Sequence, residues 1–168
     1  MQVTAIIAEW NPLHRGHLLP VQAARQQGAT HIVAILSGNF VQRGEPALCP
    51  WQYRAAAALS SGVDLVLLLP LPYAVSTAQH FAGGAVASLA ALGAVDSLIF
   101  GSECGELAAL RSVAAALDSP DLPAALAPHL QKGLPFAAAR QAAVHSLLGE
   151  DAGLLSSPNN ILGIEYLR

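Results

Sequence analysis

The sequence has little charge, little cysteine and no long uninterrupted apolar run. Only 11% of its 168 residues are charged and 54% are hydrophobic, which is typical of a globular chain and excludes a disordered one. The net charge of −3 argues against a domain that holds nucleic acid mainly by its overall charge. At this length we expect one domain with enough chain to bury a core.

The scarce cysteines and the short apolar runs also bear on the compartment. Cys49 and Cys104 lack the spacing of a metal or redox site, which favours a reduced intracellular protein. The most apolar stretch, Leu65 to Val75, contains two prolines and is too short to span a bilayer. No signal peptide is predicted, because a basic segment is missing and Glu9 interrupts the first apolar run. We therefore expect a cytoplasmic protein without a membrane partner.

Apolar runs alternate with helical segments in the first part of the chain. Strands are predicted at Val3–Ala8, His31–Leu36, Val63–Leu69 and Val95–Phe100, and helices at Leu18–Gln27, Trp51–Ser61 and from Ser76 or Thr77 to Leu92. Because each strand is a nearly continuous apolar run, the third one included, we expect a buried parallel sheet with helices on both faces. From Glu106 onward the segments are helical and rich in alanine and leucine. The pattern predicts one α/β, Rossmann-like domain over 1–168, with its core in 1–105 and a helical extension in 106–168.

The stretch Glu9–His17 lies between the first strand and the first helix. Asn11-Pro12 and Gly16 favour a tight turn there, and His14 and His17 flank the glycine. The first N–H groups of a helix lack partners within it, and the helix dipole attracts negative charge at this end. Imidazole and guanidinium groups add donors suited to phosphate oxygens. We predict a nucleotide phosphate site; a solvated polar turn and a zinc site are weaker alternatives, the latter because further ligands are missing nearby.

Positive charge gathers near this stretch. Arg15, Arg25, Arg43 and Arg54 make up half of the basic residues, and none occurs between Ala55 and Leu110. Polar segments that contain glycine follow the first, second and fourth predicted strands. Ligands of open α/β sheets bind at the carboxyl ends of the strands, so this placement agrees with a phosphate site.

Several motifs resemble one known family. They are Glu9–His17, Ser37–Ala47, Arg54, Asp64–Val66, Leu69-Pro70, Phe100–Glu103 and Ser157–Gly163, in family order from end to end of the chain. With His14-Arg15-Gly16-His17 as the signature of the HxGH nucleotidylyltransferase superfamily, they resemble the N-terminal catalytic portion of the tRNA(Met) cytidine acetate ligases. The chain departs from the family at Trp51-Gln52, where Lys-Trp is common, and at Leu68 or Leu69, where a glutamate is frequent. Family members are also much longer, so we expect a truncated form or a naturally short relative.

The resemblance implies a reaction and its partners. Such enzymes use ATP to activate acetate as acetyl-adenylate and then acetylate N4 of the wobble cytidine of elongator tRNA(Met). Most tRNA contacts would belong to the C-terminal part that this chain lacks. Mg²⁺ is expected because it accompanies ATP phosphates, not because a ligand set is visible, and no residue is assigned as a metal ligand.

The resemblance also implies site residues. His14, His17 and Arg43 are the predicted catalytic residues, with Arg43 as a clamp on pyrophosphate or substrate. The predicted nucleotide contacts are Ile7, Ala8, Glu9, Trp10, Asn11, Pro12, Leu13, His14, Arg15, Gly16, His17, Leu18, Gly101, Asn159 and Asn160.

Several residues have an alternative assignment. Arg43 would otherwise pair with Glu45, and Gly101 would be a plain turn glycine. Asn159 and Asn160, which could read the adenine edge, would otherwise cap a helix, and Asn160 is favoured over Asn159 as the contact. Glu103 would orient a ligand hydroxyl or a metal-bound water, or else be a favourable acid in the first turn of a helix.

Two other functions stay open from the sequence. One is a nucleotidylyltransferase with a different small-molecule acceptor, against which the Gly38–Pro46 loop argues. The other is a truncated module that binds ATP without turnover.

Overall fold

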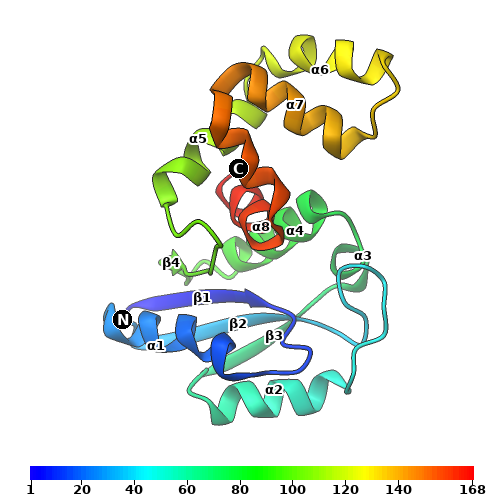
Figure 1. Cartoon of the computed structure of the whole chain (residues 1–168). Helices are drawn as coiled ribbons and strands as arrows, with labels where there is room; N and C mark the ends of the chain where they lie inside the picture. Colours follow the sequence, from blue (N-terminus) through cyan, green and yellow to red (C-terminus); the bar gives the residue numbers. More distant parts are fainter. The chain divides into compact units, whose positions relative to one another are not determined.

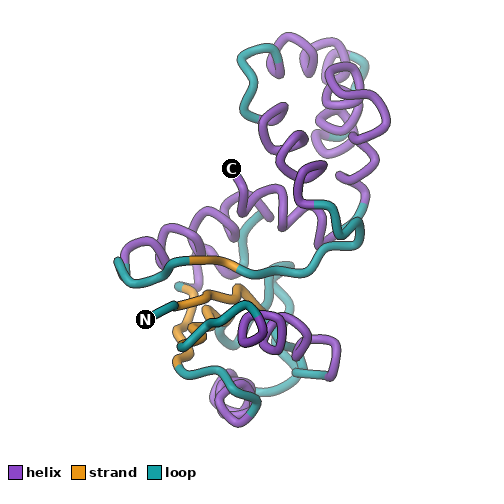
Figure 2. Tube along the Cα trace, turned by 90° about the vertical axis from the view of Figure 1, so that its left-hand side faces the viewer, coloured by secondary structure: helices purple, strands orange, loops and turns teal.

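The structure, a computed structural model, describes all 168 residues apart from the side chain of Glu150. The chain forms two compact units, Met1–Phe100 and Gly101–Arg168. The strands of the described chain lie in the first unit, and the second unit is built from helices (Figure 2).

The first unit alternates strands and helices as the sequence predicts. Its elements in order are β1 (Val3–Ala8), the 3-10 helix η1 (Arg15–His17), α1 (Leu18–Gln26), β2 (His31–Ser37), α2 (Trp51–Ser60), β3 (Leu65–Leu69), α3 (Leu71–Ala74), α4 (Ala78–Ala91) and β4 (Ser97–Leu98). The four strands form a parallel sheet in the order β3-β2-β1-β4. The carboxyl ends of the strands therefore share one edge, where the Glu9–His17 turn leaves β1.

Helices cover both faces of this sheet, as predicted. Figure 1 shows α2 and α4 on opposite sides of the strands. On the α2 side, alternate residues of β2 such as Ile32, Ala34 and Leu36 join a buried cluster with residues of α1 and α2. This alternation is the two-residue period of a strand, which sends successive side chains to opposite faces. The fold class is confirmed as an open α/β sheet followed by a helical C-terminal region.

The edges of the sheet differ from the sequence prediction. β3 is not fully buried, because Leu65 and Leu68 are 45% and 39% exposed on this edge strand. β3 also begins at Leu65, after a turn, and the predicted strand Val95–Phe100 pairs only at Ser97 and Leu98. An apolar run sets the maximum length of a strand, whereas its actual length depends on how many residues find a hydrogen-bonding neighbour. Beyond β3, the chain forms the short helix α3.

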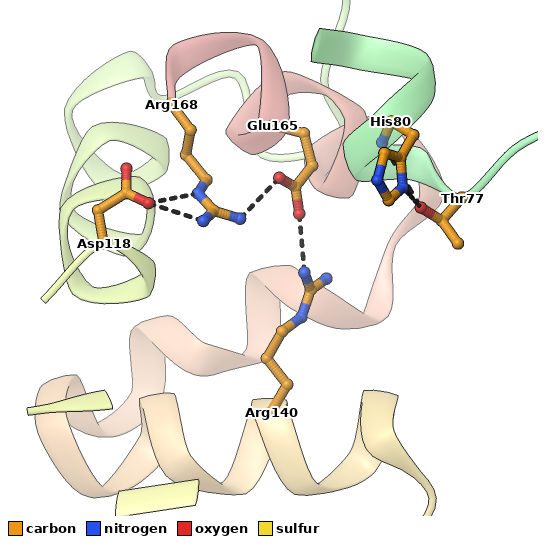
Figure 3. Close-up of polar contacts among 6 residues, drawn as sticks. All are labelled: Thr77, His80, Asp118, Arg140, Glu165 and Arg168. Atoms are coloured by element: carbon orange, nitrogen blue, oxygen red, sulfur yellow. Dashed lines mark hydrogen bonds and ion pairs between the residues drawn. The ribbon is translucent and has the colours of Figure 1, made fainter. Parts of the chain in front are cut away.

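The second unit packs helices around a buried carboxylate. Its elements are α5 (Leu107–Leu117), α6 (Leu122–Gln131), α7 (Phe136–Leu148), the 3-10 helix η2 (Gly149–Ser156) and α8 (Pro158–Leu167). Glu165 of α8 binds Arg140 at 2.7 Å and Arg168 at 2.9 Å, and Arg168 also binds Asp118 at 2.7 Å (Figure 3). These ion pairs fix α5, α7 and α8 to one another. Among the described residues, no helix combines the length and the apolar character that crossing a bilayer requires.

Candidate functional site

The two histidines of the first turn stack on each other. Their ring centroids lie 3.5 Å apart with an angle of 22° between the planes. His14 Nδ1 accepts a hydrogen bond from the backbone N–H of Gly16 at 3.2 Å, and His17 Nδ1 accepts one from the N–H of His14 at 3.3 Å. This reciprocal pattern caps η1, directly ahead of α1, and satisfies two N–H groups that a helix start leaves without partners.

These hydrogen bonds fix where a proton sits on each ring. A nitrogen that accepts a hydrogen bond carries no proton, so each neutral ring holds its proton on Nε2. Burial disfavours the charged form of His17 and lowers its pKa, and the neighbouring His14 lowers that pKa further, while the Pro12 carbonyl acts in the opposite direction. His17 therefore supplies a neutral imidazole donor at neutral pH.

Gly16 allows His14 to take this position. A Cβ atom on Gly16 would lie 3.1 Å from Cε1 and 3.3 Å from Nδ1 of His14, closer than ordinary van der Waals contact. The sequence prediction placed this glycine in the turn and among the nucleotide contacts. The structure gives it a role within the protein as well, because any side chain would displace the ring that caps η1.

The turn after β1 holds the loop after β2. Glu9 Oε1 accepts a hydrogen bond from the N–H of Gln42 at 2.6 Å, and Asn11 Oδ1 accepts one from the N–H of Leu48 at 2.7 Å. Burial raises the pKa of Glu9, although the Gln42 N–H and the charges of Arg54 and Arg43 oppose this rise. The Asn11 side chain therefore ties the turn after β1 to the segment that precedes α2.

Arg54 of α2 also binds the turn after β1 and the loop after β2. This side chain of α2 is only 1% exposed, and its guanidinium donates to the backbone carbonyls of Glu9, Gly38 and Cys49. The sequence marked Arg54 as part of a family motif but gave it no role. Its acceptors lie in three separate segments, which a local sequence pattern does not reveal.

Other predicted residues of the turn serve the core. Trp10 is 4% exposed and belongs to the buried cluster under α1 and α2, with Leu13 packed against that cluster. Trp10 also adopts a positive φ of 44°, an unusual conformation for a bulky residue. Ile7 and Ala8 end β1, and the backbone reverses through a cis Asn11-Pro12 bond.

Arg43 and Arg15 are exposed on this side of the first unit. The arginines that form ion pairs within the described part of the chain are Arg25, Arg140 and Arg168. The alternative pairing of Arg43 with Glu45 is therefore wrong for this structure. Arg43 instead lies within electrostatic reach of Glu9.

In the second unit, Glu103 binds the first turn of α8. Its Oε1 accepts from the backbone N–H of Asn159 at 3.0 Å and from Asn159 Nδ2 at 3.1 Å, and its Oε2 accepts from the N–H of Asn160 at 2.7 Å. Burial acts to raise the pKa of Glu103, but these hydrogen bonds outweigh it and the pKa is lowered. Glu103 thus stabilises the start of a helix far along the chain, while it does not itself lie in the first turn of a helix as the alternative had it.

The two asparagines differ in what their side chains do. Asn160 is 3% exposed, and its Oδ1 accepts from the N–H of Cys104 at 3.1 Å. Asn159 is exposed, as is Gly101. The predicted nucleotide contacts therefore divide between the units: residues 7–18 belong to the first, whereas Gly101, Asn159 and Asn160 belong to the second.

One polar residue at this edge was not predicted as part of the site. Ser37, the last residue of β2, is fully buried, and its Oγ is the one buried side-chain polar atom without a hydrogen-bond partner among those described. Buried polar atoms normally have a hydrogen-bond partner, so the unpartnered hydroxyl of Ser37 is unusual. The described residues contain no group of three or more His, Cys, Asp or Glu that could hold a metal ion.

Comparison with known proteins identifies the family of this chain. A family model described as HIGH Nucleotidyl Transferase matches residues 1–168. The chain belongs to this family. The tRNA(Met) cytidine acetate ligase of Syntrophotalea carbinolica is 49% identical over 173 residues, which cover 100% of this chain and 41% of that protein. The protein of the same name from Caldanaerobacter subterraneus subsp. tengcongensis is 47% identical and is covered to 43%.

Solved structures of this family of nucleotidyl transferases extend the comparison. Thermotoga maritima TmcAL bound with alpha-thio ATP matches with a TM-score of 0.93 and 40% sequence identity, over 99% of this chain and 42% of that one. The apo form matches equally well. The resemblance that the sequence motifs predicted is confirmed, and the chain spans about two-fifths of the length of the curated relatives it matches.

Proposed function

We propose that this chain binds ATP at the Glu9–His17 turn and forms acetyl-adenylate from ATP and acetate. One observation carries the proposal. Two stacked imidazoles occupy the start of a helix at the carboxyl edge of the sheet, in a chain similar from end to end to tRNA(Met) cytidine acetate ligases. Helix starts favour anions, and neutral imidazoles with a proton on Nε2 donate to phosphate oxygens.

In the proposed step, an acetate oxygen attacks the α-phosphorus of ATP. An O–P bond forms, the bond from the α-phosphorus to the bridging oxygen breaks, and pyrophosphate leaves with the electron pair. His14 and His17 donate to the phosphate oxygens on which charge accumulates, and Arg43 holds the departing pyrophosphate. Catalysis of this kind depends on positioning and charge stabilisation more than on covalent chemistry.

In the second proposed step, the acetyl group of acetyl-adenylate is transferred to the tRNA. N4 of the wobble cytidine of elongator tRNA(Met) attacks the acetyl carbon, and AMP leaves. Gly101, Asn159 and Asn160 are the nucleotide contacts that we propose in the second unit. Mg²⁺ would accompany the ATP phosphates, and the cytoplasm is the expected compartment of such a reaction.

Isotope exchange between ATP and pyrophosphate tests the first step. We expect exchange that requires acetate and that is lost in His17→Ala, whereas His31→Ala keeps it, because His31 lies at the amino end of β2. ATP affinity measured by calorimetry should fall at least about tenfold in His17→Ala, since a hydrogen bond to a charged group contributes about 1.5–3 kcal/mol. A wild-type chain that fails to bind ATP contradicts the proposal.

The alternative function is a module that binds ATP without turnover. ATP binding that is lost in His17→Ala, without exchange in the presence of acetate, would favour this binding module over the adenylate-forming enzyme.

A further inference from the structure

Arg54 contacts the backbone at three points around the candidate site, one in the turn after β1 and one at each end of the loop between β2 and α2. Nη1 donates to the Glu9 carbonyl at 2.5 Å, Nη2 donates to the Gly38 carbonyl, and Nε donates to the Cys49 carbonyl at 3.3 Å. These carbonyls stand where the chain leaves β1, where it leaves β2 and just before α2 begins. A single planar group therefore sets the spacing of three backbone segments.

Two of these segments lead to the predicted catalytic residues. The chain continues from Glu9 to the His14–His17 pair, and from Gly38 to Arg43. The Glu9 carboxylate reinforces the connection, because its Oε1 binds the Gln42 N–H beside Arg43. The histidine turn and the Arg43 loop are thus tied to each other twice, by Arg54 and by Glu9.

We infer that Arg54 is a positioning residue, which sets the separation of the histidine pair from Arg43 and thereby the affinity for the triphosphate of ATP. This inference rests on the proposed function. It concerns a residue that is 1% exposed and that acts on ligands only through the backbone it holds.

The role requires arginine and not just a positive charge. Guanidinium presents five N–H donors in a rigid fork, whereas the ammonium of lysine is a compact charge with three donors at one point. Lysine at this position would keep the charge that faces Glu9 but could not reach three carbonyls from separate segments. Arg54→Lys therefore removes the hydrogen bonds that position the backbone while it keeps the positive charge.

Arg25 provides a matched control. It also binds two carbonyls, those of Ala29 and Gly62 at 2.9 Å each, together with Asp64 at 2.7 Å. These partners lie before β2 and β3, at the amino ends of the strands. Arg25→Met should therefore remove a comparable set of hydrogen bonds without affecting the histidine turn.

The test uses the full chain at a temperature well below the Tm of each variant. Hydrogen exchange without ligand should show loss of protection in residues 9–17 and 38–50 of Arg54→Lys, and ATP should bind about tenfold more weakly, equivalent to about 1.4 kcal/mol. Arg25→Met should leave the protection of both segments and the affinity for ATP unchanged. If Arg54→Met folds, it should show the same losses. If Arg54→Met does not fold, Arg54→Lys alone provides the test.

The outcomes separate the inference from the proposed function. Normal protection in Arg54→Lys overturns positioning, whether or not ATP binds. Lost protection with an unchanged Kd for ATP also overturns it, because Arg54 would then be merely structural. A wild-type chain without ATP affinity contradicts the proposed function, and the triphosphate role of Arg54 fails with it.

Discussion

The two edges of the sheet in the first unit are each tied by an arginine, but the chemistry differs. At the amino edge, Arg25 and Asp64 form an ion pair at 2.7 Å with side chains 36% and 41% exposed. At the carboxyl edge, Arg54 is buried, and its hydrogen-bond acceptors are carbonyls alone. An exposed ion pair adds modest stability, whereas a buried cation costs solvation and must be held by several acceptors.

Unfavourable features gather at the carboxyl edge. Besides the buried cation, it carries the positive φ of Trp10 and the unpartnered hydroxyl of Ser37. Strained backbone and unsatisfied polar atoms persist where the surrounding structure enforces them, and such positions cluster at functional sites. The contrast between the edges therefore supports the placement of the site independently of sequence motifs.

The largest difference is expected in stability. Arg54→Met removes the donors of three partly buried carbonyls and the charge of a buried side chain, so the free energy of unfolding should fall by about 3 kcal/mol. Arg25→Met should lower it by about 1 kcal/mol, because its ion pair is exposed to water. Urea denaturation measures both. Equal losses in the two variants would remove the distinction between the edges.

Gly16 tests how tightly the carboxyl edge is packed. Gly16→Ala should lower stability by about 1 kcal/mol, as loss of a helix cap does, because the new Cβ meets the His14 ring. Gly38→Ala is the control at the same edge, since a Cβ there meets nothing within 4 Å. Thermal denaturation and the His14 ring signals in NMR spectra should both respond to the first change and not to the second. A silent Gly16→Ala would show that the His14 ring is free to move.

The two central strands of the sheet, β1 and β2, followed from the sequence more closely than the two outermost strands, β3 and β4, did. β1 matches the predicted Val3–Ala8, and β2 extends the predicted strand by one residue to Ser37, because both strands have neighbours on either side. β3 and β4 have a neighbour on one side only, so part of each apolar run stays unpaired or exposed. Apolar patterns report burial, and they do not report which strand lies at an edge.

In the candidate site, contacts between residues close in sequence were predictable, whereas contacts between residues far apart in sequence were not. The histidine pair was predictable because its helix start, its glycine and its ring donors lie within four residues of sequence, from His14 to His17. Arg54 and Glu103 act on segments far along the chain: Arg54 on the Glu9 carbonyl, and Glu103 on the start of α8. A single sequence does not reveal such partners, so the role of Arg54 was missed and that of Glu103 stayed open between alternatives.

Titration of two carboxylates should sharpen the comparison of the edges. The pKa of Glu9 is raised, mainly by burial. For Asp64, burial acts to raise the pKa, but the Ile32 N–H and Arg25 outweigh it, so the pKa is lowered. Stability from Asp64 is therefore present above its usual pKa of 3.8 and lost as the pH falls through the lowered value. Glu9 has the opposite sign: its contribution is present below 4.5 and is lost as the pH rises through its raised pKa.

Substitution at neutral pH gives the corresponding test. Asp64→Asn should lower the free energy of unfolding by about 1 kcal/mol or less, because the group is well exposed. Glu9→Gln should leave stability unchanged or raise it, since the amide oxygen still accepts from Gln42 and the cost of burying a charge disappears. Denaturation of both variants over a range of pH measures the effect. A marked loss in Glu9→Gln would mean that the charge opposite Arg54 outweighs burial.

The smallest effect concerns the charge of the histidine pair. His17 should titrate below 6.5 in NMR spectra, because burial and the adjacent His14 disfavour its charged form, and stability should fall as the pH drops through 6.5. His14→Gln should raise the pKa of His17 only part of the way back toward its usual value of 6.5, since burial is the larger cause of the lowering. An unchanged pKa of His17 in His14→Gln would show that the stacked rings do not repel each other's charge. If it does shift, the carboxyl edge keeps His17 neutral by burial together with the adjacent His14, whereas the amino edge neutralises the charge of Asp64 by an ion pair with Arg25.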